Sequence, residues 1–187
     1  MKECPQFVKV NDKKYKINTN YKVALRCDEV IKDNTIKDYE KTLAIIYLLF
    51  GKEALKDRDN RNRLIELAYK YLSCGEEPKG HNSKPDMSLE RDFKLIRASF
   101  KSDLGIDLLK EDINWWDFCT YLNGLTEGCI LNRVRELRNL DISKIEDAKE
   151  RQRAQEAKQY WALEKEEIKP TEEQQKNAEE FWKSMGY

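Results

Sequence analysis

The spacing of apolar and polar residues changes once near the start of the chain. Residues 7–10 and 14–17 alternate in part between apolar and polar side chains, and they flank the polar pair Asn11 and Asp12. Short alternating runs around a polar pair predict a small β-hairpin. From Asn20 onward, apolar residues recur every three or four positions, as they do on one face of a helix. The pattern predicts a mostly α-helical fold with a small N-terminal β-hairpin.

Residues that commonly start or end helices divide the next part of the chain into six helices. Asn20, Asp38 and Asn114 have side chains that can cap a helix start, and Gly51 and Gly105 stand where a helix should end. The second helix is apolar almost all round, which indicates that its neighbours enclose it. The expected helices cover about 20–33, 38–50, 60–74, 88–104, 114–122 and 130–137.

Two further helices are predicted toward the C-terminus. Residues 143–146 have the Ser-x-x-Glu pattern of a capping box, which should open a long charged helix that ends near Glu167. Residues 171–174 form a second such box and should open a terminal helix. The long helix has few large apolar residues before Tyr160 and Trp161, so we expect it to project from the core or to pack lightly on it.

These patterns predict two regions. Residues 1–142 should form a compact multi-helix core domain that includes the hairpin, and residues 143–187 should form a charged helical C-terminal extension. Hydrophobic residues make up 40% of the 187 residues, which is enough for a core of this size. Charged residues make up 37%, so the surface should be unusually polar.

Charge and cysteine content exclude several classes of protein. The 35 basic and 35 acidic side chains cancel, so the chain lacks the overall positive field typical of nonspecific nucleic-acid binders. The five cysteines are scattered and include no Cys-x-x-Cys pair, which argues against a disulfide framework or a zinc ribbon. No stretch approaches the roughly 20 apolar residues that span a bilayer. We therefore expect a cytoplasmic protein without a membrane partner.

No group of side chains in the sequence predicts catalysis. His81 is the only histidine, and it lies in a loop with two glycines and two prolines, residues 75–87, which should be mobile. Residues 57–60 resemble the opening of a calcium loop, but Arg61 occupies the next ligand position, so a surface loop that starts a helix is favoured. Four carboxylates surround the predicted turn at Gly105 and can be explained by solvation and capping: Asp103, Asp107, Glu111 and Asp112. We expect no enzyme, no metal site and no cofactor.

Binding to another macromolecule is the remaining class of function. Large apolar side chains that the chain has least means to bury are the candidates for partner contacts: Trp116, Trp161, Phe181, Trp182 and Met185. Phe181, Trp182 and Met185 lie on one face of the expected terminal helix, and docking of this face back onto the core is an equally good interpretation. An alternative function is a nucleic-acid-binding regulatory protein whose basic helix face carries Arg133, Arg135 and Arg138, although Glu136 and Asp141 are interleaved with them.

Several segments, in their order and spacing, resemble the bacteriophage gene-product-fifteen family. The resemblance includes the Asn-Trp-Trp-Asp-Phe motif that begins at Asn114 and extends over most of residues 7–163. The segments that carry it are residues 8–19, 92–100, 104–108, 114–118, 122–125, 138–145 and 160–163. The sequence departs from the family pattern around His81 and beyond Glu164.

The resemblance implies a role in phage or prophage tail morphogenesis. Family members occur in tailed phages and prophages of Gram-positive bacteria, where the gene typically lies near that of the tape-measure protein, and they are regarded as tail assembly chaperones. The expected activity is therefore non-enzymatic binding of the tape-measure polypeptide in the cytoplasm of the bacterial host, with residues 143–187 taking part. The sequence leaves formation of a homo-oligomer open.

Overall fold

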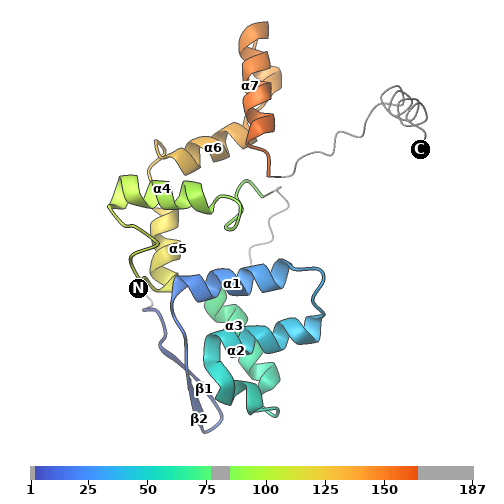
Figure 1. The fold of residues 1–187 in the computed structure, drawn as a ribbon, viewed down its shortest axis with the longest axis vertical. Coiled ribbons are helices and arrows are strands. Elements are labelled where there is room, and N and C mark those ends of the chain that lie inside the picture. The colour runs from blue at the N-terminus through green and yellow to red at the C-terminus, as the bar shows by residue number, and fades with distance from the viewer. Residues whose placement is uncertain (1–2, 77–84, 164–187) are drawn as a thin grey trace, which may run out of the picture. The chain divides into compact units, whose positions relative to one another are not determined.

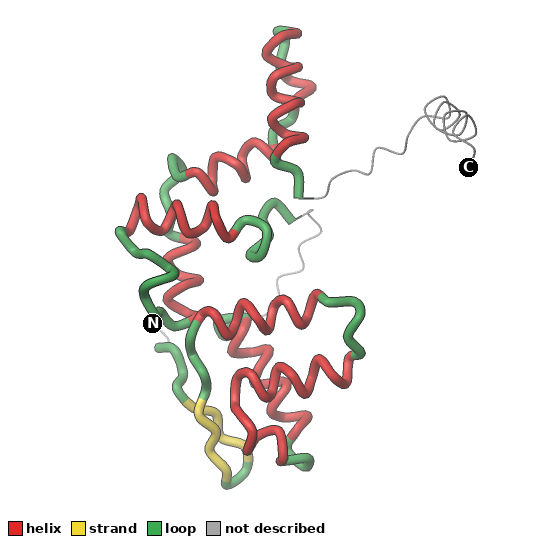
Figure 2. The backbone as a smooth tube through the Cα atoms, in the orientation of Figure 1, coloured by secondary structure: helices red, strands yellow, loops and turns green. Residues whose placement is uncertain are grey.

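A computed structural model of the chain describes residues 3–76 and 85–163 (Figure 1). Within these residues, seven α-helices, one short 3₁₀-helix and one two-stranded hairpin account for the regular structure (Figure 2). The predicted fold class, mostly α-helical with a small N-terminal β-hairpin, is confirmed. The chain divides into two compact units, Met1–Asn139 and Leu140–Tyr187. The predicted domains, 1–142 and 143–187, stay a prediction.

The elements follow one another in a simple order along the chain. Helices of the first unit pack mainly on their neighbours in sequence, with additional contacts between α1 and α5 and between α4 and α6. The bounds are β1 Phe7–Val10, β2 Lys13–Lys16, α1 Tyr21–Lys32, α2 Asp38–Lys56, α3 Arg61–Leu72, α4 Phe93–Leu104, α5 Trp115–Asn123, α6 Ile130–Asn139, η1 Ile142–Lys144 and α7 Ala148–Tyr160.

The hairpin forms where the alternating pattern predicts it. Strands β1 and β2 pair antiparallel, with Val10 opposite Lys13, and Asn11 in the turn has a positive φ of 53°. Asparagine is one of the few residues that tolerate this left-handed backbone. Val10 and Tyr15 are buried while their neighbours face solvent. One face of the hairpin therefore belongs to the core.

Helix α2 is the central element of the helices near the hairpin, as its all-round apolar sequence predicts. Ile45, Ile46 and Leu49 are fully buried, and α2 packs against both α1 and α3. As predicted, the helical backbone stops at Gly51, but the sequence analysis did not predict the helical segment that follows it. Gly51 has φ 81° and ψ −172°, which kinks the chain, and a helical segment resumes through Lys56 with Ala54 buried. The apolar residues after the glycine have a core to pack on, so the helical path continues beyond the interruption.

The starts of α1 and α5 are set by capping side chains, as predicted. The Asn20 side chain accepts a hydrogen bond from the Lys22 amide at 2.9 Å, and the Asn114 side chain accepts one from the Asp117 amide at 2.9 Å. Gly105, with φ 73°, ends α4 in the left-handed conformation that glycine adopts without steric cost. These short-range signals can be recognised in the sequence because each acts within a few residues.

A stacked aromatic cluster joins α1, α4 and α5. Phe118 is fully buried, and its ring centroid lies 5.0 Å from that of Tyr21, 5.3 Å from that of Phe100 and 5.4 Å from that of Trp115. Offset or tilted ring pairs at such spacings add to the stabilisation that burial alone provides. The cluster fixes the positions of α1 and α4, the two elements that border the groove described below.

The second unit contains η1 and α7. The predicted capping box at Ser143 is wrong, because the Asp141 carboxylate accepts hydrogen bonds from both the amide and the hydroxyl of Ser143 and holds it in the 3₁₀ turn. Asp147 instead accepts from the Glu150 amide at 2.7 Å and caps α7. Helix α7 has no buried residue. The terminal helix predicted from residue 171 lies outside the described residues.

Asp57 ties the hairpin to the junction between α2 and α3. Its buried carboxylate accepts hydrogen bonds from Lys13 Nζ at 2.7 Å, from the Tyr15 hydroxyl and from Asn60 Nδ2 at 3.0 Å. These bonds, that of Lys13 first, hold the pKa of Asp57 well below its ordinary value. The sequence predicts a surface loop that starts a helix here, and α3 does begin at Arg61. The hydrogen bonds of Asp57 were not predicted, because its partners on β2 are distant in the chain.

Replacing Asp57 by asparagine should change how stability depends on pH. Because its folded-state pKa is lowered, ionised Asp57 stabilises the fold above the unfolded-state pKa of about 3.9, and this contribution is lost as the pH falls through the folded-state pKa. Asp57→Asn should therefore be less stable than the wild type near neutral pH, and the difference should shrink below about pH 4. Urea unfolding between pH 7 and pH 3 measures it, with the exposed neighbour in Asp59→Asn as control. A difference that is constant across this range would contradict the assignment.

Candidate protein-binding groove

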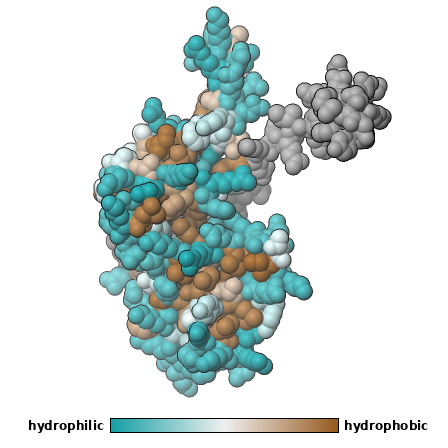
Figure 3. Space-filling model, in the orientation of Figure 1, coloured by the Kyte–Doolittle hydropathy of each residue, from teal (hydrophilic) through white to brown (hydrophobic). Residues whose placement is uncertain are grey.

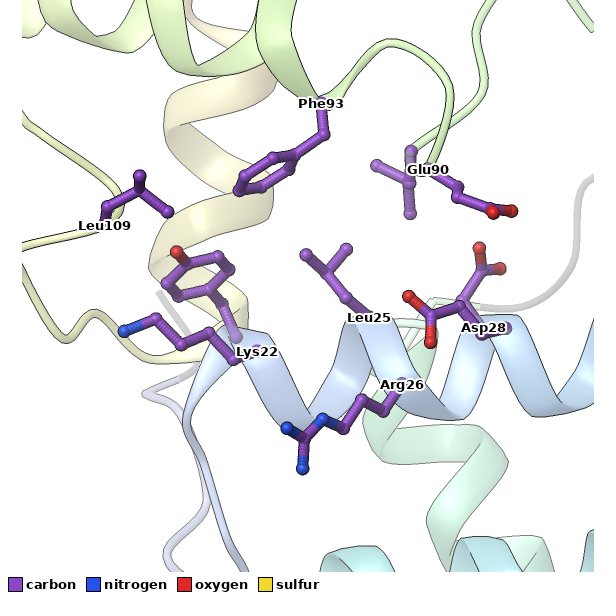
Figure 4. Close-up of a pocket in the computed structure, with 10 residues that line it drawn as sticks. Lys22, Leu25, Arg26, Asp28, Glu90, Phe93 and Leu109 are labelled. Carbon is purple, nitrogen blue, oxygen red and sulfur yellow. The ribbon is translucent and has the colours of Figure 1, made fainter.

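A cavity in the first unit lies between α1 and the segment that leads into α4 (Figure 4). Its volume is about 350 Å³, which is near the lower end of the range for ligand-binding pockets. Its lining residues come from three places: Tyr21, Lys22, Leu25, Arg26, Asp28 and Glu29 of α1, Leu89 and Glu90 of the segment before α4 with Phe93 at the first position of α4, and Leu109 of the loop before α5. We call this cavity the α1–α4 groove.

The floor of the α1–α4 groove is apolar. Figure 4 shows Leu25 and Phe93 pointing toward one another from opposite sides, with Leu109 beside them. Tyr21 and Leu25 are four residues apart and therefore lie on the same face of α1. Leu109 is 56% exposed, which is high for a leucine next to other apolar side chains. The space-filling view shows brown apolar residues reaching the surface around α1 among teal hydrophilic ones (Figure 3).

Charged side chains form the rim of the groove. Lys22 Nζ lies 3.2 Å from Asp112 Oδ1, in a pair that is largely exposed and therefore weak. Asp28 pairs with Lys32 at 2.6 Å on the same helix. Within the described residues, the side chains of Arg26, Glu29 and Glu90 have no hydrogen-bond or ion-pair partner. The rim thus carries charge that is exposed to solvent and that is not paired within the described part of the chain.

Tyr21 is anchored below this rim. Its hydroxyl donates a hydrogen bond to the Leu108 carbonyl, and burial raises the pKa of its phenol above the ordinary value. A neutral phenol whose polar atom is satisfied acts here as an apolar wall of the groove. Sequence reasoning missed this site, because Leu25, Phe93 and Leu109 are far apart in the chain. The four-residue spacing of Tyr21 and Leu25 was the only local signal.

Trp116, predicted to contact a partner, has contacts within its own chain. Its indole Nε1 donates to the Tyr71 carbonyl at 3.0 Å, and its ring stacks on that of Tyr71. Trp115 Nε1 donates to the Leu72 carbonyl at 2.8 Å. Both indoles therefore fasten α5 to the end of α3. Trp116 lies outside the α1–α4 groove, and its role in partner binding stays a prediction.

The remaining predicted partner residues lie in the second unit. The Trp161 ring packs edge-on against that of Tyr160 at 5.0 Å, and Tyr160 is 80% exposed. Phe181, Trp182 and Met185 lie outside the described residues, as does His81. Of the predicted candidates, the structure describes Trp116 in the first unit and Trp161 in the second.

The arginines proposed for nucleic-acid binding do not form an open basic face. Arg138 makes a bidentate ion pair with Asp92, in which both N–O distances are 2.7 Å. The side chain of Arg138 is 9% exposed and that of Asp92 is 4% exposed. Arg135 pairs with Asp86 at 3.2 Å. Only Arg133 of the three is an exposed residue. The alternative of a phosphate-binding surface on this helix therefore loses support, because carboxylates far away in sequence neutralise two of the three cations.

The carboxylates around Gly105 also have separate structural partners. Asp103 accepts hydrogen bonds from the amide and the hydroxyl of Thr126 at 2.9 and 2.7 Å. Asp107 accepts from the Arg97 guanidinium at 3.0 and 3.3 Å. These hydrogen bonds lower the pKa of Asp103 and of Asp107, so both carboxylates are ionised at neutral pH. The arrangement ties loops to helices and does not pair carboxylates for acid–base catalysis.

The five cysteines are free thiols. Burial raises the pKa of Cys27 to about 12, so this residue behaves as a small apolar side chain. The Cys119 thiol hydrogen-bonds to the Cys74 sulfur, which lowers the pKa of Cys74 and raises that of Cys119. Cys4 Sγ lies 3.8 Å from the Tyr71 hydroxyl. Residues 3–76 and 85–163 contain no cluster of three or more side chains suited to holding a metal ion.

Comparisons with known proteins give one positive result. Residues 1–163 match the profile of a protein family described as "Bacteriophage Gp15 protein". No curated protein and no solved structure matches the chain significantly. Across the described residues, the helices are too short or too polar to cross a membrane.

Proposed function

Because the chain belongs to the Bacteriophage Gp15 protein family, we propose that it is a non-enzymatic tail assembly chaperone that binds the tape-measure polypeptide in the cytoplasm of the bacterial host. A chaperone for a long helical client needs apolar anchors bordered by charge and needs no chemical centre. In this proposal the α1–α4 groove is one client-binding surface. The charged C-terminal region, residues 143–187, supplies further contacts through Trp161, Phe181, Trp182 and Met185.

The observation that carries the proposal is the α1–α4 groove itself. It combines an apolar floor with charged side chains that lack partners among the described residues, and it lies within the part of the chain that matches the family profile. Apolar surface bordered by a polar, solvent-exposed rim is typical of a protein-binding site before its partner binds. The nucleic-acid alternative has lost its main support, since Arg135 and Arg138 are engaged by carboxylates.

Co-expression tests the proposal. The full chain carrying an affinity tag is produced together with the tape-measure polypeptide of the same phage or prophage, and another tail protein of that phage serves as the control client. We expect the tagged chain to retain the tape-measure polypeptide and not the control tail protein. We also expect the tape-measure polypeptide to be more soluble than when it is produced without the chain. We also expect weaker retention by a chain shortened at residue 142, checked for folding by circular dichroism. Absence of any complex with the full chain would contradict the proposal.

A further inference from the structure

Charge is distributed unequally along the α1–α4 groove. Figure 4 shows Lys22 near Leu109 at one end and Asp28 and Glu90 near one another at the other end, with Leu25 and Phe93 between. Glu29 adds a third carboxylate to the lining. Lys22 and Asp28 are separated by six positions of α1, which corresponds to about 9 Å along a helix axis. The groove therefore has an acidic end and an end with Lys22, whose largely exposed ion pair with Asp112 is weak.

We infer that the α1–α4 groove binds one amphipathic helix of the client in a fixed direction. This inference rests on the proposed function and specifies the segment of the tape-measure polypeptide that is bound. The helix places apolar side chains over Leu25 and Phe93, an acidic residue near Lys22, and a basic residue near the carboxylates of Asp28 and Glu90. At about 1.5 Å per residue, the acidic and basic residues of the client are six or seven positions apart.

The walls of the groove favour a helix over an extended strand as the occupant. The groove runs beside helix α1 and the start of helix α4, and within the described residues the sheet consists only of the hairpin strands β1 and β2. An extended peptide gains most of its affinity by pairing with a sheet edge, which the groove does not present. A helix instead buries apolar side chains at three- and four-residue spacing between neighbouring helices.

The acidic end gives the occupant its direction. Among the lining residues, Lys22 and Arg26 carry positive charge, whereas Asp28, Glu29 and Glu90 carry negative charge. Lys32 pairs with Asp28, but Glu29 and Glu90 have no described partner. When an apolar client covers the floor, water is displaced and the repulsion between these carboxylates grows. A basic client residue removes the repulsion, while an acidic one increases it, so one orientation is selected.

Peptide binding tests this inference with the full chain. Overlapping fluorescein-labelled peptides of about 25 residues, long enough to form helix on binding, cover the tape-measure polypeptide of the same phage, and fluorescence anisotropy measures their affinity. The double variant Glu29→Lys/Glu90→Lys should weaken binding of the best peptide at least about tenfold, because two favourable contacts become repulsive. Leu109→Asp, which alters an exposed anchor, should weaken it similarly. The control Glu127→Lys/Glu136→Lys makes the same change in charge at two exposed positions outside the groove and should leave the affinity unchanged.

A charge-swapped peptide supplies the decisive comparison. A peptide in which the basic residue is replaced by glutamate should lose affinity for the wild type and regain it with Glu29→Lys/Glu90→Lys. If peptides bind but the groove variants have no effect, the groove assignment is wrong while the proposed function survives. If neither peptides nor the full tape-measure polypeptide bind, both fail. If the groove variants instead turn a dimer into a monomer in sedimentation, a second copy of the chain occupies the groove and the inference is overturned.

Discussion

Replacing Arg138 by methionine is expected to lower the free energy of unfolding by about 3–5 kcal/mol, the range for breaking one side of a buried ion pair. The guanidinium of Arg138 donates to both carboxylate oxygens of Asp92 at 2.7 Å and also to the Asp86 carbonyl at 2.8 Å. Methionine fills a similar volume but leaves the Asp92 carboxylate buried without its counter-ion. Chemical denaturation at pH 7 measures the loss.

The reason for this large effect is the environment of Asp92. Burial alone raises the pKa of Asp92, but the hydrogen bonds from Arg138 and from the Ser88 amide outweigh it and leave the pKa lowered. Asp92 therefore depends on its partners to stay ionised inside the protein. Without Arg138, the side chain must either take up a proton or remain charged in a poorly solvated site, and both alternatives destabilise the fold.

Arg135 provides the matched control for Arg138. It lies on the same helix and pairs with Asp86 at 3.2 Å, but its side chain is 38% exposed. Water can solvate both partners after Arg135→Met, so we expect a loss of no more than about 1 kcal/mol. Equal effects of the two substitutions would show that burial of the Arg138 pair does not determine its contribution. A further variant, Arg138→Met/Asp92→Leu, should recover part of the stability lost by Arg138→Met alone.

Much of the fold could be predicted because its signals are local. The caps at Asn20 and Asn114 and the glycine at Gly105 act within a few residues of the helix ends that they determine, so the sequence pattern contains them directly. Asn11 and the alternation of apolar and polar residues on either side of it similarly predict the hairpin. Each of these features requires only the residues that surround it in the chain.

The errors arose where two local signals compete or where tertiary contacts decide. Ser143 matches a capping box, but Asp141 binds its amide and hydroxyl, and Asp147 caps the helix instead. Gly51 does interrupt the helical backbone, but the helical segment that resumes after it and ends at Lys56 was not predicted, because its buried Ala54 is held by packing on the core. Propensity is a weak prior in both places, and the packing of the folded chain overrides it.

The candidate site could not be predicted, because no short segment contains it. Leu25, Phe93 and Leu109 are brought together only when α1 packs near the start of α4. The same limit applies to the arginine face, since Arg138 finds Asp92 46 positions away. From the scarcity of histidine and the scatter of the cysteines, the sequence predicts binding without catalysis, and this stays a prediction. The sequence could not place the binding surface.

Replacing Phe118 by alanine should be about as destabilising as breaking the buried ion pair, with an expected loss of about 3–5 kcal/mol. Phe118 is fully buried, and it stacks on Tyr21 of α1, Phe100 of α4 and Trp115 of α5. Alanine leaves a cavity between three helices that cannot all move inward, because each also packs on other elements. Thermal and chemical unfolding measure the loss.

Two companion substitutions separate ring stacking from general burial. Phe118→Leu keeps much of the apolar volume but loses the ring contacts, so its loss should lie well below that of Phe118→Ala. Phe7→Ala changes the same residue type where the side chain is 46% exposed, and it should cost less than about 1 kcal/mol. The Phe118 ring links Tyr21, which lines the groove, to Phe100 of α4. Phe118→Leu should therefore also weaken peptide binding, and by more than the small fraction of unfolded protein that the lost stability produces can explain. A Phe118→Leu variant with unchanged peptide affinity would show that the groove keeps its shape without this aromatic contact.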